Sequence, residues 1–480
     1  MADTDDLQHH DDLDSHLKEV QHLLARHKLV EGLVHRQDMP KHDLVESLVH
    51  KQHVQELTHK LDSLHSADVA HILEALPLED RLFVWDLVKA ERDGEILLEV
   101  SDAVRESLIE SMDPASLRAA AEQLDADELA DLAPDLPQEV MEDVYRGLDP
   151  EEREQLRAAM SYPEDSVGAL MDFEMVTVRE DVTLEVVLRY LRRFEELPDH
   201  TDQLFVVDRD EHLRGVLPIN RLLLSDPETE VSDIMLTDTL TLEPADEAET
   251  AAQAFERYDL VSAPVVDYHR KLVGRLTVAA VVDFIREETE NELLSQAGLK
   301  EGEDIFAPVW DSVKNRWAWL AVNLVTAFFA SRVIGAFEHS IEKLVALAAL
   351  MPIVAGIGGN SGNQTITMIV RGIAMGQVQE DALTRLLKKE MGVALINGLV
   401  WGGLLGVLAW ILYGSGKLGA VMTAAMTLNL LLAAFVGVMA PMIRHRLGQD
   451  PAVGSSVIIT AVTDSGGFFI FLGLATIFLM

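Results

Sequence analysis

Apolar residues recur at helical spacing over residues 61–161, in short segments about a dozen residues apart. Several segments begin at an Asp or a Pro, which suits the first turn of a helix. The pattern predicts an all-α superhelical domain built from stacked short helices. Residues 1–60 contain a near-repeat, LVEGLVHRQ at 29–37 and LVESLVHKQ at 44–52, which predicts two short amphipathic helices able to pack as a hairpin.

Strand and helix patterns alternate over residues 162–288, and the segment repeats itself. FVVD at 205–208 matches PVVD at 264–267, which divides the segment into copies at 162–227 and 228–288. The order of elements resembles a tandem of CBS domains, an α/β repeat that usually senses a small ligand. CBS copies that bind adenine nucleotides often carry an Asp three residues after a Thr or Ser. Because 218–221 and 277–280 lack that Asp, we do not expect a nucleotide there.

The back of the chain is apolar. An acidic helical connector at 289–311 leads into a membrane domain at 312–480. Five apolar segments of that domain are long enough to cross a bilayer as helices, namely 317–337, 344–369, 391–413, 418–443 and 452–479. The fold class is therefore multidomain, with an all-α domain, an α/β tandem and a domain of five transmembrane helices.

Lys and Arg residues flank these segments unevenly. Eight lie on the side that also holds the front of the chain: Lys314, Arg316, Arg371, Arg385, Lys388, Lys389, Arg444 and Arg446. Three lie toward the opposite side: Arg332, Lys343 and Lys417. By the positive-inside rule, the N-terminal domains are cytoplasmic and the C-terminus lies outside the plasma or inner membrane.

The charge of the chain sits in its front part. The 480 residues have a net charge of −42, yet the first 310 carry 73 of the 81 acidic and 28 of the 39 basic residues. This excess disfavours nucleic acid as a partner and attracts cations. Twelve of the 17 His lie between His9 and His71. They indicate either metal binding or pH sensing, or a solvated tail, and the irregular spacing favours the tail.

One apolar segment has a polar centre. Residues 356–365 read GIGGNSGNQT inside the segment at 344–369. Polar side chains do not face lipid, so this run either packs tightly against another helix or lines a wet path. Two Asn, one Gln, one Ser and one Thr within six residues exceed what close packing requires, which favours the path.

The last apolar segment carries a single acid, Asp464, whose placement in a bilayer is costly. The carboxylate either serves as hydrogen-bonded packing or faces a cation, since Arg332 is the one basic residue inside the apolar segments. The chain has no Cys, and the only His of the membrane part, His339 and His445, lie near segment ends. Oxygen ligands alone favour Mg²⁺ or Ca²⁺, and one Asp per chain suits hydrated Mg²⁺ held on the two-fold axis of a homodimer.

MPIVAGIGGNSGNQTITMIVRGIA at 351–374 and DPAVGSSVIITAVTDSGG at 450–467 resemble the signature stretches of the MgtE family of magnesium channels. The resemblance covers residues 60–480 and implies a homodimer that mediates Mg²⁺ uptake and is held shut by Mg²⁺ at acidic cytosolic sites. It implies that Asp464 is the pore aspartate, that Asp450 lies at the cytoplasmic mouth, and that the path is lined by Asn360, Asn363, Thr365 and Thr460.

The same resemblance makes the connector a plug helix, with Asp283, Glu288 and Glu292 as its regulatory Mg²⁺ ligands. Asn291 stands where the family pattern suggests a carboxylate, and Ala280 is another neutral position, which implies a weaker or rearranged sensor.

The sequence leaves two alternatives open. A secondary transporter would exchange Mg²⁺ for protons or sodium, with Asp464 as its coupling site. A route for Co²⁺ or Mn²⁺ is the second alternative. An enzyme is not expected, because the sequence lacks GxxxxGK[ST], a Cys nucleophile and HExxH.

Overall fold

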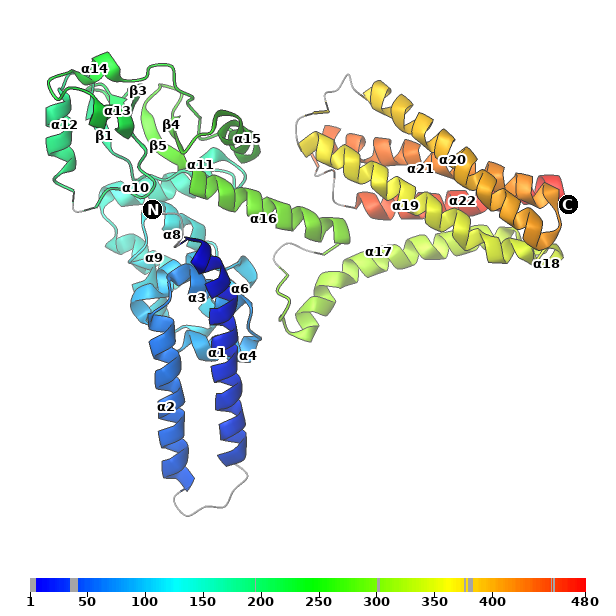
Figure 1. Cartoon of the computed structure of the whole chain (residues 1–480), viewed down its shortest axis with the longest axis horizontal. Coiled ribbons are helices and arrows are strands. Elements are labelled where there is room, and N and C mark those ends of the chain that lie inside the picture. The colour runs from blue at the N-terminus through cyan, green and yellow to red at the C-terminus, as the bar shows by residue number, and fades with distance from the viewer. Residues whose placement is uncertain are drawn as a thin grey trace. The chain divides into compact units, whose positions relative to one another are not determined.

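The computed structural model describes residues 6–34, 42–194, 196–299, 303–374, 377–378, 383–449, 451 and 454–480 (Figure 1). The chain divides into two compact units. The front unit comprises Met1–Glu288 together with Asp304–Ala307, and the back unit comprises Thr289–Glu303 together with Pro308–Met480.

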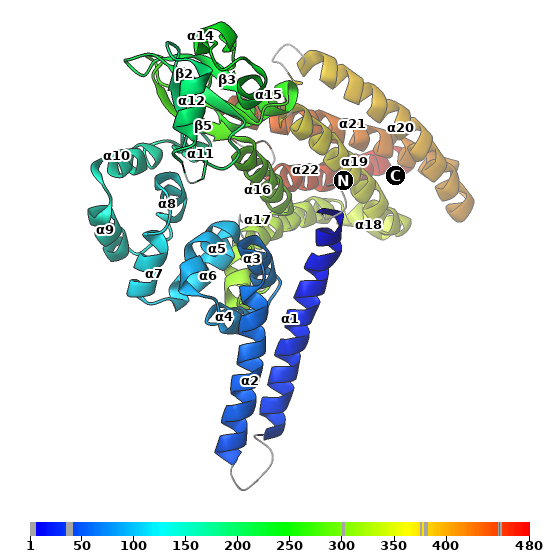
Figure 2. The ribbon, with the colours of Figure 1, turned by 60° about the vertical axis from the view of Figure 1, so that its left-hand side comes forward.

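A long helical hairpin opens the front unit. Helices α1 (Asp6–Val34) and α2 (His42–Asp62) lie antiparallel and side by side in both views (Figures 1 and 2). They are far longer than the two short helices that the near-repeat predicts. Val20 on α1 and Leu57 on α2 are fully buried, because the apolar positions of both helices face the same core.

Two histidines of this hairpin are buried rather than solvated. His27 and His53 are 5 % and 6 % exposed, and their ring centroids lie 5.9 Å apart. His27 also stacks on Phe83 at 5.0 Å. The interpretation of this region as a solvated tail is therefore wrong at these positions, since helix packing removes both rings from water.

Short helices follow, as the spacing predicts. Asp113 and Asp149 act as N-caps, each accepting backbone N–H groups of the next turn, and a Pro follows each cap. The elements are α3 (Ser66–Glu74), α4 (Leu78–Trp85), η1 (Ala90–Arg92), α5 (Asp93–Glu99), α6 (Asp102–Ser111), α7 (Pro114–Ala121), α8 (Ala126–Leu132), α9 (Gln138–Gly147) and α10 (Pro150–Ala159).

The tandem repeat forms two small sheets. In the first, β1 pairs parallel with β2, and β2 pairs antiparallel with β3; in the second, β4 pairs antiparallel with β5. Alternating Val and Leu residues of these strands face two apolar cores. The elements are α11 (Val167–Leu170), β1 (Thr177–Arg179), α12 (Leu184–Leu191), β2 (Gln203–Val207), β3 (Leu213–Pro218), α13 (Ile219–Leu224), α14 (Val231–Ile234), α15 (Ala248–Tyr258), β4 (Ser262–Val266) and β5 (Leu272–Thr277).

The connector is helical over only part of the predicted range. Helix α16 (Val278–Ala297) starts directly after β5 and ends where Gly298 adopts a φ of 78°. Leu299 N–H donates to Leu294 C=O at 2.9 Å, the bond pattern of a glycine-terminated helix. The next described helix begins at Val309.

The back unit is a bundle of long helices. Four of the described helices are long and apolar enough to cross a membrane: α17 (Val309–Ala336), α20 (Leu383–Tyr413), α21 (Gly416–Arg446) and α22 (Ser455–Leu479). The short α18 (Glu338–Lys343) leads into α19 (Ala346–Ala374), which occupies the segment with the polar centre. Small residues bring α20 and α21 together, since a Cβ on Gly406 would lie 2.6 Å from the carbonyl oxygen of Gly419.

Candidate functional site

The polar centre of α19 is continuous helix. Gly356 through Thr365 all lie inside the helix, so their backbone groups bond within it and only side chains need a polar environment. Asn360 is exposed and Asn363 is partly buried, with an Oδ1 atom that has no hydrogen-bond partner among the described residues. These two amides are among the polar groups that α19 offers to an ion or to water, together with the exposed Gln364.

Helix α22 packs against this part of α19. A Cβ on Gly362 would lie 2.2 Å from Ile459 Cγ1, and one on Gly359 would lie 3.6 Å from Thr463 Oγ1. Because Gly359 and Gly362 have no side chains, α22 can approach the polar centre of α19 closely. Thr460 and Asp464 lie within one helical turn of these contacts. The structure thus brings Asn360, Asn363, Thr460 and Asp464 onto one pair of neighbouring helices.

Asp464 is half-buried and has no ion pair within the described parts of the chain. Its neighbour Thr463 is fully buried and uses its hydroxyl to bond the carbonyl of Ile459 at 2.8 Å. The carboxylate of Asp464 is consequently the available charge on α22. Carboxylate and amide oxygens at this place suit a hard cation such as Mg²⁺ or Ca²⁺.

Thr365 lies apart from this group. It is buried, and its hydroxyl bonds Ser361 C=O at 3.2 Å and Glu390 Oε2 at 3.4 Å. A Cβ on Gly437 of α21 would lie 2.9 Å from Thr365 Cβ. Thr365 therefore faces α20 and α21, whereas Gly359 and Gly362 of α19 face α22.

Sequence reasoning missed two polar residues of this bundle. Glu390 on α20 is 6 % exposed, and Lys389 Nζ lies 3.2 Å from its Oε1. Asn429 on α21 is fully buried. The sequence offers only a weak signal for each: Glu390 is a single acid at the edge of the segment 391–413, and Asn429 is a single amide inside the segment 418–443.

The predicted regulatory acids lie on one helix. Asp283, Glu288 and Glu292 all belong to α16. Asp283 is exposed and lies 3.8 Å from Arg286. The predicted mouth residue, Asp450, falls outside the described residues.

A second group of acids lies where α8 meets the start of the tandem repeat, and sequence reasoning missed it. Burial and the nearby charge of Asp172 raise the pKa of Asp127 from 3.8 to about 7. Burial likewise raises the pKa of Glu128 and of Asp172, even though Arg275 lies 2.6 Å from Asp172. Asp127 Oδ1 is buried without a hydrogen-bond partner among the described residues. These carboxylates repel one another, so a divalent cation would stabilise their ionised forms.

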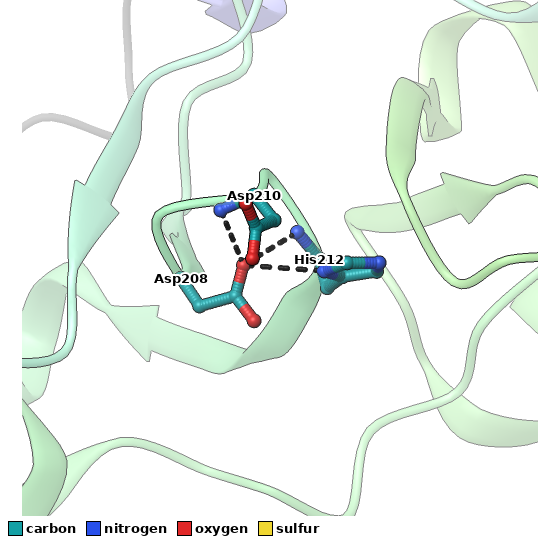
Figure 3. A group of neighbouring side chains, drawn as sticks. All are labelled: Asp208, Asp210 and His212. Atoms are coloured by element: carbon teal, nitrogen blue, oxygen red, sulfur yellow. Dashed lines mark hydrogen bonds and ion pairs between the residues drawn. The ribbon is translucent and has the colours of Figure 1, made fainter.

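A third group is explained by local structure. Asp208, Asp210 and His212 have ligand atoms within 4.8 Å of one another in the turn between β2 and β3 (Figure 3). Asp208 Oδ1 accepts the backbone N–H groups of Asp210 and His212 at 2.9 and 3.0 Å. Arg214 pairs with the other carboxylate oxygen of Asp208 at 2.9 Å. This arrangement stabilises a hairpin turn and leaves little of Asp208 for a metal.

Comparisons with known proteins match each part of the chain that they cover to a domain found in magnesium transporters of one family. A family profile described as a divalent cation transporter matches residues 351–474, the MgtE intracellular N domain matches 64–165, and the CBS domain matches 167–226 and 231–287. The chain is 31 % identical to the magnesium transporter MgtE of Thermus thermophilus over 432 residues, which cover 88 % of this chain and 95 % of the relative.

A second relative is the magnesium transporter MgtE of Bacillus subtilis, 26 % identical over 89 % of this chain and 94 % of its own length. Among solved structures, the front of the chain is similar to the cytosolic domain of the Mg²⁺ channel MgtE in complex with ATP. That match has 31 % identity and a TM-score of 0.45, and it covers 50 % of this chain and 98 % of the solved chain.

Proposed function

We propose, from the premise that this chain belongs to the MgtE family of magnesium transporters, that it is a Mg²⁺-selective channel. The family consists of transporters and not of enzymes. The observation that carries the proposal is Asp464, a carboxylate without an ion pair among the described residues, on the helix that packs against the polar centre of α19. A charge inside a bilayer costs about 3 kcal/mol, which a permeating cation offsets.

The ligand chemistry supports Mg²⁺ as the permeating ion. Mg²⁺ keeps most of its water and needs only one or two carboxylates, whereas Ca²⁺ prefers six to eight oxygen ligands. Asp464 with Asn360 and Asn363 provides one carboxylate and two amides per chain. Two chains around a two-fold axis would place two Asp464 carboxylates on one hydrated ion, which is why we propose a homodimer.

We infer that α19 is a fifth membrane crossing. Its 29 residues extend about 43 Å as a helix, more than the roughly 30 Å of a hydrocarbon core. Five crossings, with most Lys and Arg on the side of the front unit, place the N-terminal domains in the cytoplasm and the C-terminus outside the inner membrane. Uptake is then the direction favoured by a negative membrane potential.

We further propose that cytosolic Mg²⁺ closes the channel. Burial and the nearby charge of Asp172 raise the pKa of Asp127 to about 7, and burial raises that of Asp172, so Mg²⁺ binding favours the compact arrangement that holds these carboxylates together. Asp283, Glu288 and Glu292 on α16 lie in the sequence between this acidic group and the membrane helices, and we propose them as further regulatory Mg²⁺ ligands. Converting a mostly open channel to a mostly closed one requires about 10⁴-fold tighter binding to the closed state, which several weak sites acting together supply.

The test is Mg²⁺-dependent growth of a bacterium that lacks its own magnesium uptake. We expect wild type to restore growth at low Mg²⁺, and Asp464→Asn to fail although its amount in the membrane is unchanged. Asp311→Asn is the matched control, since Asp311 is exposed and lies 2.9 Å from Lys314. Equal growth with wild type and Asp464→Asn would refute the proposed role of Asp464. Flux that requires a counter-ion gradient would favour an exchanger instead.

A further inference from the structure

An asparagine on a helix that sequence reasoning treats as purely apolar connects the two helices of the proposed path. Asn429 on α21 is fully buried, and its Nδ2 donates to the carbonyl oxygen of Val354 on α19 at 2.9 Å. The carbonyl oxygen of Val354 therefore accepts a hydrogen bond from a residue of another helix. This bond lies two residues before the polar centre of α19 at 356–365.

Two glycines leave room for the Asn429 side chain. A Cβ on Gly358 of α19 would lie 2.2 Å from Asn429 Nδ2, and a Cβ on Gly467 of α22 would lie 2.7 Å from the same atom. Such distances are far below van der Waals contact, so neither position accepts a side chain while Asn429 is in place. The amide therefore occupies the junction of α19, α21 and α22.

The junction is adjacent to the residues of the proposed path. Gly358 precedes Asn360 by two residues, and Gly467 follows Asp464 by three. Each contact of Asn429 thus lies within one helical turn of a path residue. We propose that Asn429 is a positioning residue for ion permeation: it fixes the spacing and register of α19 and α22, so that the amides of α19 lie level with Asp464. This inference rests on the proposed function.

Stability alone does not account for an asparagine here. Asn429 Oδ1 is buried without a hydrogen-bond partner among the described residues, and an unsatisfied buried acceptor destabilises a fold. Leu has a comparable volume and no such atom, and the neighbouring Met426, Leu430 and Ala433 are apolar and buried. The amide differs from Leu in one respect that matters for position, its directional bond to Val354.

The experiment measures Mg²⁺ and Co²⁺ flux per molecule of full-length protein in liposomes, together with thermal unfolding. The variants are Asn429→Ala, Asn429→Leu, Gly467→Ala and the double variant Gly467→Ala/Asn429→Ala. Gly473→Ala is the matched control on α22, because nothing lies within 4 Å of a Cβ at that position.

We expect Asn429→Ala and Asn429→Leu to change the Co²⁺-to-Mg²⁺ flux ratio about fivefold, the factor that corresponds to the free energy of one lost hydrogen bond. This change should occur even if Asn429→Leu unfolds at no lower temperature than wild type. Gly467→Ala loses most of its flux because its methyl group collides with the amide. The double variant regains flux to the level of Asn429→Ala, since the shortened side chain makes room, and Gly473→Ala behaves as wild type.

Wild-type flux ratios in both Asn429 variants would overturn the positioning role, and so would a double variant no more active than Gly467→Ala. A folded wild type that passes no Mg²⁺ would instead refute the proposed function, and the inference with it. The Mg²⁺ flux of the wild-type protein therefore distinguishes failure of the positioning role from failure of the proposed function.

Discussion

The two buried or half-buried acids of the membrane helices have different surroundings at the scale of single residues. Glu390 lies against Lys389 and Thr365, whereas Asp464 has no ion pair within the described chain. A carboxylate that already has a cation and a hydrogen-bond donor is stabilised within the protein. These surroundings support a structural role for Glu390 and the proposed role of Asp464 in cation permeation.

This difference gives a first prediction. Glu390→Ala should lower the unfolding free energy of the protein by about 1–3 kcal/mol, because Thr365 and Lys389 lose a buried partner. The ratio of Mg²⁺ to Co²⁺ flux in liposomes should stay that of wild type. Asp464→Asn should show the reverse, an altered flux with an unchanged unfolding temperature. A changed flux ratio in Glu390→Ala would place Glu390 in the path.

The acids near α8 predict a pH dependence. The pKa of Asp127 is raised to about 7, so the folded protein binds more protons than the unfolded chain between about pH 4 and 7. The stability contributed by protonated Asp127 is present below the unfolded pKa and is lost as the pH rises through 7. Mg²⁺ competes with that proton, so tighter Mg²⁺ binding is expected at pH 8 than at pH 6.

The measurement is the Mg²⁺ concentration that gives half of the maximal thermal stabilisation of the full-length protein, at both pH values. Asp127→Asn should flatten the difference between pH 6 and pH 8. Asp143→Asn is the control, since Asp143 is a surface residue that pairs with Arg146 at 2.8 Å. The same pH difference in Asp127→Asn and wild type would contradict the assignment.

Sequence reasoning predicted some of these residues and not others, for a physical reason. Asp464 is visible in the sequence because an acid inside an apolar run is conspicuous without knowledge of its neighbours. The importance of Asp127 depends on Asp172, which lies 45 positions away, and that of Asn429 on Gly358 and Gly467. Burial by residues distant in sequence leaves no local pattern.

At the scale of elements, the N-terminal hairpin shows how burial changes the meaning of a composition. A His-rich segment favours a solvated tail, yet the packing of α1 and α2 buries His27 and His53. Helix periodicity in this segment was the better guide than its polarity. The near-repeat at 29–37 and 44–52 predicted helices that were too short, because the apolar positions of both helices continue beyond it.

His53 provides a test of this packing. Its Nδ1 is buried without a hydrogen-bond partner among the described residues. His53→Leu keeps a similar volume and removes that atom. The unfolding free energy of the front unit should therefore rise by about 1 kcal/mol, which a higher unfolding temperature would show. His59→Leu, at an exposed position of the same helix, should give no gain. A loss of stability in His53→Leu would show that the ring has a partner that Leu cannot replace.

At the scale of the whole molecule, a residue of the connector belongs to the front unit. Asp304 Oδ2 lies 2.7 Å from Arg81 Nη1, and the Arg81 side chain is fully buried. Asp304→Ala would leave that guanidinium buried without its counter-charge, which costs about 3–5 kcal/mol. We expect faster hydrogen–deuterium exchange in α4 of the full-length protein, although the two residues are 223 positions apart. Asp311→Ala, which removes an exposed pair, should leave α4 unchanged.

The number of membrane crossings decides where the C-terminus lies, and the absence of native Cys makes this measurable with single-cysteine variants. Five crossings place Glu338, Lys417 and Met480 outside and Ser63 inside. A membrane-impermeant maleimide applied to intact cells should then label Glu338→Cys, Lys417→Cys and Met480→Cys, and should label Ser63→Cys only after permeabilisation.

If α19 did not cross, the membrane would be spanned by the four described helices that are long and apolar enough to do so. Glu338→Cys would still be labelled, because α17 crosses before it. Lys417→Cys and Met480→Cys would both become protected, because every crossing after α19 would reverse its direction. The joint behaviour of these two positions therefore separates five crossings from four. It also tests the path itself, because Asn360 and Asn363 can face an ion inside the membrane only if α19 spans it.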